Sequence, residues 1–303
     1  MKNLLVIFLC LGVSVLSAQP RIDTTFRVDV MRPMFVESQP KVLIDEAHNN
    51  LHRKETGLFA LTRMMESDGA MVESNHKKFT AEILDGYDIL IIANALHVSN
   101  VGNWQNPCPS AFSKKEIDVI VDFVNGGGAL LLVADHMPYG GAAQDLAKKF
   151  GVDWNNGFAI RQGQHWPPSV FDRKDNMVLD SPVTTDSDYS KEISYIASFA
   201  GSVFKVPENA QPFMVYDDSH IILMPDIAWQ FSEETKNENS NGWVQGACME
   251  YGKGRIVFLG EAAMITAQLG DSDHKVGMNN KEDAPENTQL ALNIFRYLAA
   301  LNN

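Results

Sequence analysis

The sequence contains few cysteines, three in 303 residues, and one of them, Cys10, lies in an N-terminal apolar run. The other two, Cys108 and Cys248, are 140 residues apart, which excludes the dense disulfide framework of small secreted domains. Their spacing is compatible with a single bridge or with two separate thiols. With 45% hydrophobic residues, the chain is long enough to form one large α/β domain or two small ones around a hydrophobic core.

Basic residues are also scarce, with 25 Lys and Arg against 38 Asp and Glu, a formal net charge of −13. Nucleic acid is therefore excluded as an expected partner, because phosphate binding depends on basic side chains. Only one long apolar run occurs, in "MKNLLVIFLCLGVSVLSAQP" at residues 1–20. Its early lysine, its length and the small residues before Gln19 are typical of a signal peptide cleaved after Ala18. We therefore expect a periplasmic or secreted protein with no transmembrane segment after signal removal.

The common nucleophile and phosphate motifs are missing. No G-x-S-x-G or H-E-x-x-H occurs, and neither Cys108 nor Cys248 is expected at the end of a strand. The glycine run at 126–128 precedes a strand rather than a helix, so it does not form a phosphate cradle. If the protein is an enzyme, we expect a hydrolase or lyase that uses no cysteine or serine nucleophile.

Strands and helices alternate over residues 41–150, and the central strands are continuous apolar runs. This pattern is typical of a parallel sheet covered on both faces. A helix is expected from Ser113, with Glu116 at capping-box spacing. The expected strands are "KVLI" (41–44), "AMVES" (70–74), "ILIIA" (89–93) and "LLVA" (131–134), and the expected flanking helices cover about 57–67 and 142–150.

After Phe150 the pattern changes. Residues 153–192 read as long loops, short antiparallel strands follow, and "KNENSNG" (236–242) reads as a surface turn. A hairpin through Gly252 and Gly254, a buried strand and an amphipathic C-terminal helix complete the chain. The predicted organisation is a signal peptide (1–18), an N-terminal extension (19–40) and a single domain (41–303) with an insertion at about 153–242.

Four apolar strands end in polar side chains. Because parallel strands point the same way, all four ends should meet at one edge of the sheet, where open α/β proteins bind their ligands. The residues at these ends that we expect to be catalytic are Asp45, His48, Asp135, His136 and Glu261. The residues that we expect to contact a ligand are Glu46, Asn49, Asn94 and His97, joined by His165 and Trp166 from the loop "QGQHWPP".

Each of these residues also has a structural explanation. Asp45 or Asp135 could cap the following helix, and Glu261 could favour a helix N-terminus through the helix dipole. A single histidine such as His97 is more often a hydrogen-bonded structural residue. The functional interpretation depends on the set, since four coincidences at equivalent positions are less probable than one shared purpose.

Two kinds of chemistry would use this set. Carboxylates and imidazoles are ligands for a divalent metal that polarises an oxygen or activates water. The same groups could act without metal as general acid and base, next to a carbonyl or on a glycosidic oxygen. The sequence leaves both alternatives open.

At the level of the fold, the chain resembles class I glutamine amidotransferase-like domains, in particular the branch without the catalytic cysteine. That branch includes exported DUF4350-type proteins, GldG and GIFT domains, and ThuA-like sugar-utilisation proteins. The resemblance covers about 41–150 and 243–301 and implies a flavodoxin-like α/β fold. It is carried by "KVLIDEAHNN", "YDILIIANAL", "FVNGGGALLLVADH", "YGKGRIVFLGEAAMIT" and "NTQLALNIFRYLAAL".

In true amidotransferases the turn after the strand that corresponds to residues 131–134 holds the nucleophilic cysteine, whereas here this turn holds Asp135 and His136. Glutamine hydrolysis is therefore not expected. The resemblance implies either a site that acts on or binds a carbohydrate-like small molecule, or a non-catalytic carbohydrate-binding or assembly module of the GldG or GIFT type.

Overall fold

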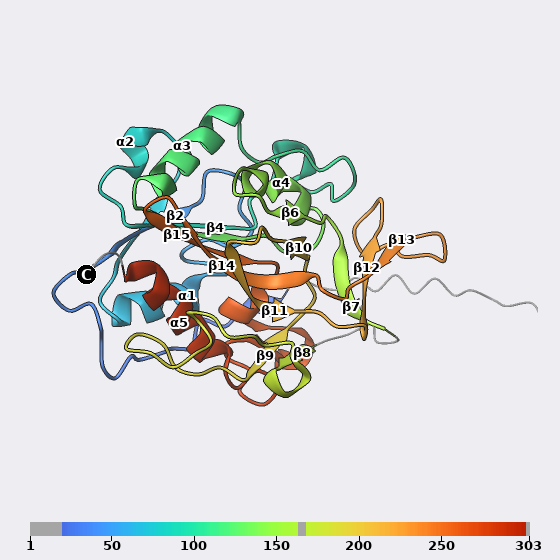
Figure 1. Cartoon of the computed structure of the whole chain (residues 1–303). Helices are drawn as coiled ribbons and strands as arrows, with labels where there is room; N and C mark the ends of the chain where they lie inside the picture. The colour runs from blue at the N-terminus through green and yellow to red at the C-terminus, as the bar shows by residue number, and fades with distance from the viewer. Residues whose placement is uncertain (1–19, 163–167, 301–303) are drawn as a thin grey trace, which may run out of the picture.

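The computed structural model describes residues 20–162 and 168–300, and a nine-stranded sheet lies at its centre (Figure 1). The strand order is β3-β2-β4-β5-β15-β14-β10-β6, and β11 also pairs with β14. These strands are β2 (Lys41–Asp45), β3 (Met71–Asn75), β4 (Ile89–Ala93), β5 (Ala129–Val133), β6 (Asp153–Trp154), β10 (Phe204–Lys205), β11 (Ala210–Val215), β14 (Val244–Tyr251) and β15 (Gly254–Leu259).

One half of the sheet is parallel. β3, β2, β4, β5 and β15 run in the same direction, and by chain order they follow the sequence 2-1-3-4-5. This is the flavodoxin-like order, so the fold class expected from the sequence is confirmed. Because β2 has β3 on one side and β4 on the other, the connections leave in opposite directions between β2 and β4. That position is the topological switch point of the sheet.

The other half of the sheet is antiparallel and begins at the predicted hairpin between β14 and β15. Gly254 begins β15 where the hairpin lies against the end of a helix. A Cβ at this position would lie 2.1 Å from the Gly128 carbonyl oxygen and 2.2 Å from that of Val124, so only glycine fits. The hairpin thereby locks the antiparallel half of the sheet to the parallel half.

Helices cover both faces of the sheet (Figure 1). Alternate strand residues face opposite sides, so that Leu131 and Val133 pack toward one face while Leu130 and Leu132 pack toward the other. Ser113 and Glu116 form the predicted capping box at the start of α3. The helices are α1 (Phe59–Ser67) and α5 (Asn287–Ala299) on the first face, and α2 (Ala81–Leu84), α3 (Lys114–Asn125) and α4 (Tyr139–Lys149) on the second.

Residues 153–242 contain more regular structure than the sequence predicted. Part of the expected loop region forms β7 (Phe158–Arg161) and β8 (Ser169–Asp172), and the expected turn 236–242 begins with β13 (Lys236–Asn239). β13 is a polar edge strand whose backbone pairs with β12 (His220–Met224), so it shows none of the hydrophobic alternation from which strands are predicted. β8 pairs with β9 (Tyr195–Ser198).

The remaining short elements lie near the chain ends and the strand ends. A small antiparallel sheet ties the N-terminal segment to the segment after β15. Its strands are β1 (Arg21–Ile22), β16 (Ala267–Leu269) and β17 (Lys275–Gly277), and the 3-10 helices are η1 (Val98–Asn100), η2 (Arg173–Asp175), η3 (Ala263–Ile265) and η4 (Asp271–Asp273). Within 20–162 and 168–300, no helix has the length and apolar character needed to cross a bilayer.

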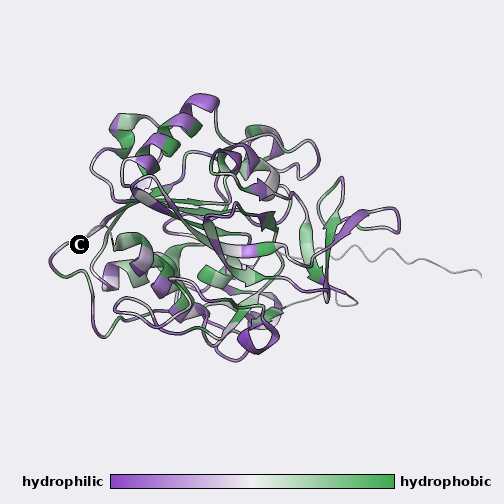
Figure 2. Cartoon of the chain, in the orientation of Figure 1, coloured by the Kyte–Doolittle hydropathy of each residue, from purple (hydrophilic) through white to green (hydrophobic). Residues whose placement is uncertain are grey.

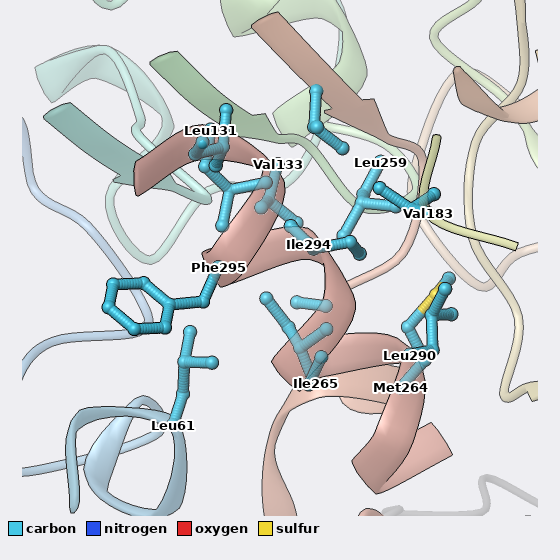
Figure 3. Close-up of a cluster of buried hydrophobic side chains, with 14 of the residues drawn as sticks. Leu61, Leu131, Val133, Val183, Leu259, Met264, Ile265, Leu290, Ile294 and Phe295 are labelled. Atoms are coloured by element: carbon cyan, nitrogen blue, oxygen red, sulfur yellow. The ribbon is translucent and has the colours of Figure 1, made fainter. Parts of the chain in front are cut away.

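The hydrophobic residues concentrate on the central strands and on the inner sides of the helices (Figure 2). Figure 3 shows the packing on the α1 and α5 face, where Ile294 and Phe295 of α5 lie near Leu131 and Val133 of β5. These side chains are all at most 3% exposed. The core on this face holds the central strands, and their carboxyl ends, in position.

We therefore expect Leu131→Ala to lower the free energy of unfolding by about 2–5 kcal/mol, because it removes buried methyl groups and leaves a cavity. Urea denaturation followed by circular dichroism measures the change. The matched control is Met71→Ala, since Met71 is 46% exposed at the start of β3 and should change stability by no more than about 0.5 kcal/mol. Equal effects of the two substitutions would contradict this account of the core.

Candidate functional site

The four polar strand ends lie at one edge of the sheet. β2 pairs with β4, β4 with β5 and β5 with β15, all in parallel, so that their carboxyl ends emerge together. Asp45 ends β2, and Asn94 directly follows β4. Asp135 follows β5 by two residues and Glu261 follows β15 by two residues, so both come after the same end of two paired strands.

Asp45, His48 and Glu116 form a buried network beside this edge. His48 Nδ1 lies 2.9 Å from both carboxylate oxygens of Asp45, and His48 Nε2 lies 2.9 Å from Glu116 Oε1. The three side chains are at most 6% exposed. The imidazole also packs against Phe79, at a ring-centre distance of 5.0 Å, and against Phe112, at 4.7 Å. Both ring nitrogens of His48 are therefore occupied within the protein.

The charges of this network reinforce one another. Burial alone would lower the pKa of His48, but hydrogen bonds and charge from Asp45 and then Glu116 raise it above its usual value. Burial would raise the pKa of Glu116, yet hydrogen bonds from Ser113 and His48 lower it to about 2. His48 is thus held as an imidazolium that donates to two carboxylates. Its acid or ligand role stays a prediction, and in this structure it ties the loop after β2 to α3.

Asp135 and Glu261 are close enough for the charge of one to affect the other. The Asp135 backbone N–H donates to Asn94 Oδ1 at 2.9 Å, and Asp135 Oδ1 accepts from the His136 N–H at 2.8 Å. Glu261 accepts from the N–H groups of Ala263 and Met264 and so caps η3, as its structural explanation anticipated. Burial, and then the charge of Asp135, raise the pKa of Glu261 well above its usual value.

His136 lies among four aromatic rings. It stacks on Phe158, with ring centres 4.5 Å apart and an interplanar angle of 12°, and meets Trp229 edge-on at 4.6 Å. Trp104 and Tyr139 lie at 6.0 and 6.3 Å. His136 Nδ1 lies 2.8 Å from the Met137 carbonyl oxygen, to which it donates, so Nε2 is the ring nitrogen without a partner among the described residues.

Two residues of this region were not identified as site residues from the sequence. Glu116 was recognised only as part of a capping box, and nothing in its spacing indicated the contact with His48, 68 residues away. His52 lies in a polar loop and is 8% exposed. Burial lowers its pKa to about 4, against the opposing charge of Asp135, so His52 is neutral at pH 7. No local pattern distinguishes either residue.

Of the residues expected to contact a ligand, some lie at a cleft and others do not. Asn49 lines a cleft. Asn49 and the buried Asn94 both adopt a left-handed φ of 50°, and Asn94 Nδ2 has no hydrogen-bond partner among the described residues. Glu46 accepts from the Lys54 N–H in the loop after β2 and from the Ser74 hydroxyl of β3. His97 hydrogen-bonds Ser99 at the start of η1. His165 and Trp166 lie outside the described residues.

A cleft of about 670 Å³ opens between the loops that follow β2 and β4. It therefore lies at the switch point of the sheet, where flavodoxin-like folds bind their ligands, and its size is within the range of small-molecule sites. Polar groups from the first loop face apolar and aromatic groups from the second. The lining residues are Asn49, Asn50, Leu51, Arg53, Thr56, Leu96, Val101, Gly102, Trp104 and Tyr139.

The cleft adjoins both polar groups already described. Asn50 lines the cleft and donates to Asp45 Oδ2 at 3.0 Å. Trp104 and Tyr139 line its other side and contact the ring of His136. A molecule in the cleft would thus be bounded by residues that the Asp45 network positions and by residues that pack around His136.

The described part of the chain offers no obvious metal centre. Among residues 20–162 and 168–300, no three or more His, Cys, Asp or Glu side chains form a group that could hold a metal ion. Cys108 and Cys248 are free thiols, so of the two alternatives for these residues the structure has the separate thiols. Burial raises the pKa of both, which leaves neither activated as a nucleophile.

Comparisons with known proteins support the fold. No family model matches the sequence, and no curated protein matches it. Among solved structures, the "mmIFT52 N-terminal domain" has a TM-score of 0.61 at 14% identity, over 86% of this chain and 99% of that one. This likeness shows a shared fold and nothing about activity.

Two further structural neighbours have lower scores. A ThuA-like protein from Bacteroides uniformis has a TM-score of 0.44 at 14% identity, over 86% of this chain and 91% of that one. A β-galactosidase from Rahnella sp. R3 has a TM-score of 0.45 at 14% identity, over 86% of this chain and 31% of that one. The strand order and the cleft themselves define the class, a flavodoxin-like α/β protein with a polar and aromatic cleft at its switch point.

The Asp45–His48–Glu116 network generates a stability prediction. His48→Ala leaves two buried carboxylates without their shared partner and should lower the free energy of unfolding by about 3–5 kcal/mol near pH 6. Because the folded-state pKa of His48 is raised, its contribution is complete below its unfolded pKa and is lost as pH rises through the folded value. The difference between wild type and His48→Ala should therefore shrink at alkaline pH.

Urea denaturation at a series of pH values from 5.5 to 10 measures this difference. His97→Ala is the matched control, because His97 is only partly buried and bonds a neighbouring serine. Its effect should stay within about 0.5 kcal/mol at every pH. A His48→Ala effect that is small, or that grows with rising pH, would contradict the ionised network.

Proposed function

We propose that this protein binds a carbohydrate-like small molecule in the cleft between the loops that follow β2 and β4. The observation that carries the proposal is the position of this cleft at the β2/β4 switch point, where the chain topology of an open α/β sheet creates a crevice. The Asp45–His48–Glu116 network supports it, because it holds the loop after β2 that forms one wall.

The lining of the cleft suits a sugar. Arg53, Asn49 and Thr56 offer donors and acceptors to hydroxyl groups, while Trp104 offers an aromatic surface to the C–H faces of a ring. Small-molecule sites in general combine apolar walls with a few placed polar groups. Arg53 is held by a hydrogen bond from its Nε to the Asn50 carbonyl oxygen at 3.1 Å, so its guanidinium is oriented before a ligand arrives.

Recognition is better supported than turnover. The polar atoms of Asp45, His48 and Glu261 are occupied by hydrogen bonds inside the protein, which favours the non-catalytic binding module. Asp135 and His136 differ, because His136 Nε2 and the second oxygen of Asp135 have no partner among the described residues. Any hydrolase or lyase reaction at this edge would therefore use Asp135 and His136 as its acid–base groups.

We also propose that the chain belongs to the cysteine-less branch of the class I glutamine amidotransferase-like superfamily, near the DUF4350-type, GldG and ThuA-like proteins. The support is the β5 turn, which carries Asp135 and His136 where an amidotransferase has its nucleophile. The assembly role of a GldG or GIFT-type module is the competing function within that branch.

Ligand binding is tested by thermal shift and calorimetry against a panel of mono- and oligosaccharides built from glucose, mannose, galactose, xylose and N-acetylglucosamine. We expect at least one series to bind, and Arg53→Ala to weaken that binding about 10- to 100-fold, since hydrogen bonds from a charged donor contribute about 1.5–3 kcal/mol. Arg53 is exposed, so the variant should fold normally.

The matched control is Lys253→Ala, an exposed cation in the turn between β14 and β15, at the opposite edge of the sheet. It should leave the affinity unchanged. Absence of binding to every saccharide in the panel, with the protein folded, would overturn the proposal. Analysis of the same mixtures for products distinguishes turnover from recognition.

We further propose that the protein is exported to the periplasm or secreted, because residues 1–18 have the composition of a signal peptide. Expression of the full sequence in a Gram-negative host, followed by fractionation and N-terminal sequencing, tests this. The expected product begins at Gln19 and is found outside the cytoplasm. Recovery of uncleaved chain only in the cytoplasm would refute export.

A further inference from the structure

Trp229 is held at the protein surface in an unusual way. Its side chain is 49% exposed, although tryptophan is the largest apolar side chain, and its backbone adopts a left-handed φ of 66°. Non-glycine residues rarely adopt this conformation, and where they do the surrounding structure must enforce it. Contacts with the surrounding structure, and not the intrinsic preference of tryptophan, therefore fix the backbone conformation of Trp229.

The loop that carries Trp229 is fastened to the rim of the cleft. It connects β12 to β13 in the small sheet beside the main one and folds back onto the loop after β4. The Asn106 N–H donates to the Asp226 carbonyl oxygen and the Ala228 N–H to that of Trp104, both at 2.8 Å. Gln105 and Ile227 form a β-bridge between the two loops. Backbone bonds thus fix Trp229 relative to Trp104.

The ring of Trp229 also packs against His136 and against Phe158, one of the other aromatic rings around it. It meets His136 edge-on at 4.6 Å and Phe158 edge-on at 4.7 Å. The ring centre of Trp104 lies 6.0 Å from the same imidazole. His136 is therefore a neighbour of two indole rings, that of Trp104, which lines the cleft, and that of Trp229.

This arrangement matches the chemistry of a saccharide chain. Each sugar ring presents C–H groups on its faces and hydroxyl groups at its edges, so two aromatic surfaces with a polar ring nitrogen near both suit two successive rings. A lipid tail has no polar group for His136 Nε2, whereas a sugar hydroxyl can form a hydrogen bond with it. Continuity with the cleft through Trp104 and His136 thus favours a carbohydrate.

We propose that Trp229 forms a second subsite, which stacks against an additional ring of a carbohydrate chain whose neighbouring ring lies in the cleft beside Trp104. This inference rests on the proposed function, and it adds the ligand class: the protein binds oligosaccharides in preference to the corresponding monosaccharides. Trp229 acts as a specificity residue for chain length.

The test measures affinity as a function of chain length. For the saccharide series that binds in the panel above, calorimetry compares the monosaccharide with its di-, tri- and tetrasaccharides. Wild type should bind the longer members more tightly. Trp229→Ala should weaken binding of those members about 3- to 10-fold, the range expected for one aromatic contact, and leave the monosaccharide unchanged.

Two further variants keep the result interpretable. Trp229→Phe, which retains a ring, should recover part of the chain-length preference, and Met71→Ala, an exposed apolar residue at the opposite edge, should behave as wild type. Binding that is lost in Arg53→Ala but has the same chain-length dependence in Trp229→Ala would overturn the second subsite and leave the proposed function intact. Failure of every saccharide to bind would overturn both.

Discussion

The imidazolium of His48, buried between two carboxylates, is the interaction on which the candidate site depends. Asp45 comes from the end of β2, His48 from the loop that follows, and Glu116 from the first turn of α3. A charge buried among Phe79 and Phe112 is tolerated only because both ring N–H groups find a carboxylate. The network therefore fixes where the loop after β2 can lie, and that loop is one wall of the cleft.

The second constraint is topological. Because β2 lies between β3 and β4, the chain leaves the sheet in opposite directions at the β2/β4 boundary, and the loops on either side cannot close over it. The cleft follows from this order of strands, whatever the loop sequences are. The loops decide its chemistry, since they supply Arg53 and Asn49 from one side and Trp104 from the other.

The residues that looked catalytic in sequence have different surroundings in the structure. Asp45, His48 and Glu261 bond to groups of the protein itself, and the carboxyl group of Glu261 caps η3 as a purely structural residue would. Asp135 and His136 each retain a polar atom that has no partner among the described residues, and aromatic rings surround His136. A position at a strand end is therefore not sufficient for a site, because the hydrogen-bond partners of each side chain decide whether it is available to a ligand.

The sequence by itself determined the alternation of strands and helices, the capping box at Ser113 and the common edge of the four strand ends, because these follow from local periodicity and from parallel strand direction. It did not reveal β13, whose polar residues pair only through backbone bonds. Nor could it reveal the contact of His48 with Glu116 or the fastening of Trp229 to Trp104, since both join segments far apart in the chain. Only the tertiary structure decided those, because hydrogen bonding and aromatic packing depend on distances in space that no local pattern encodes.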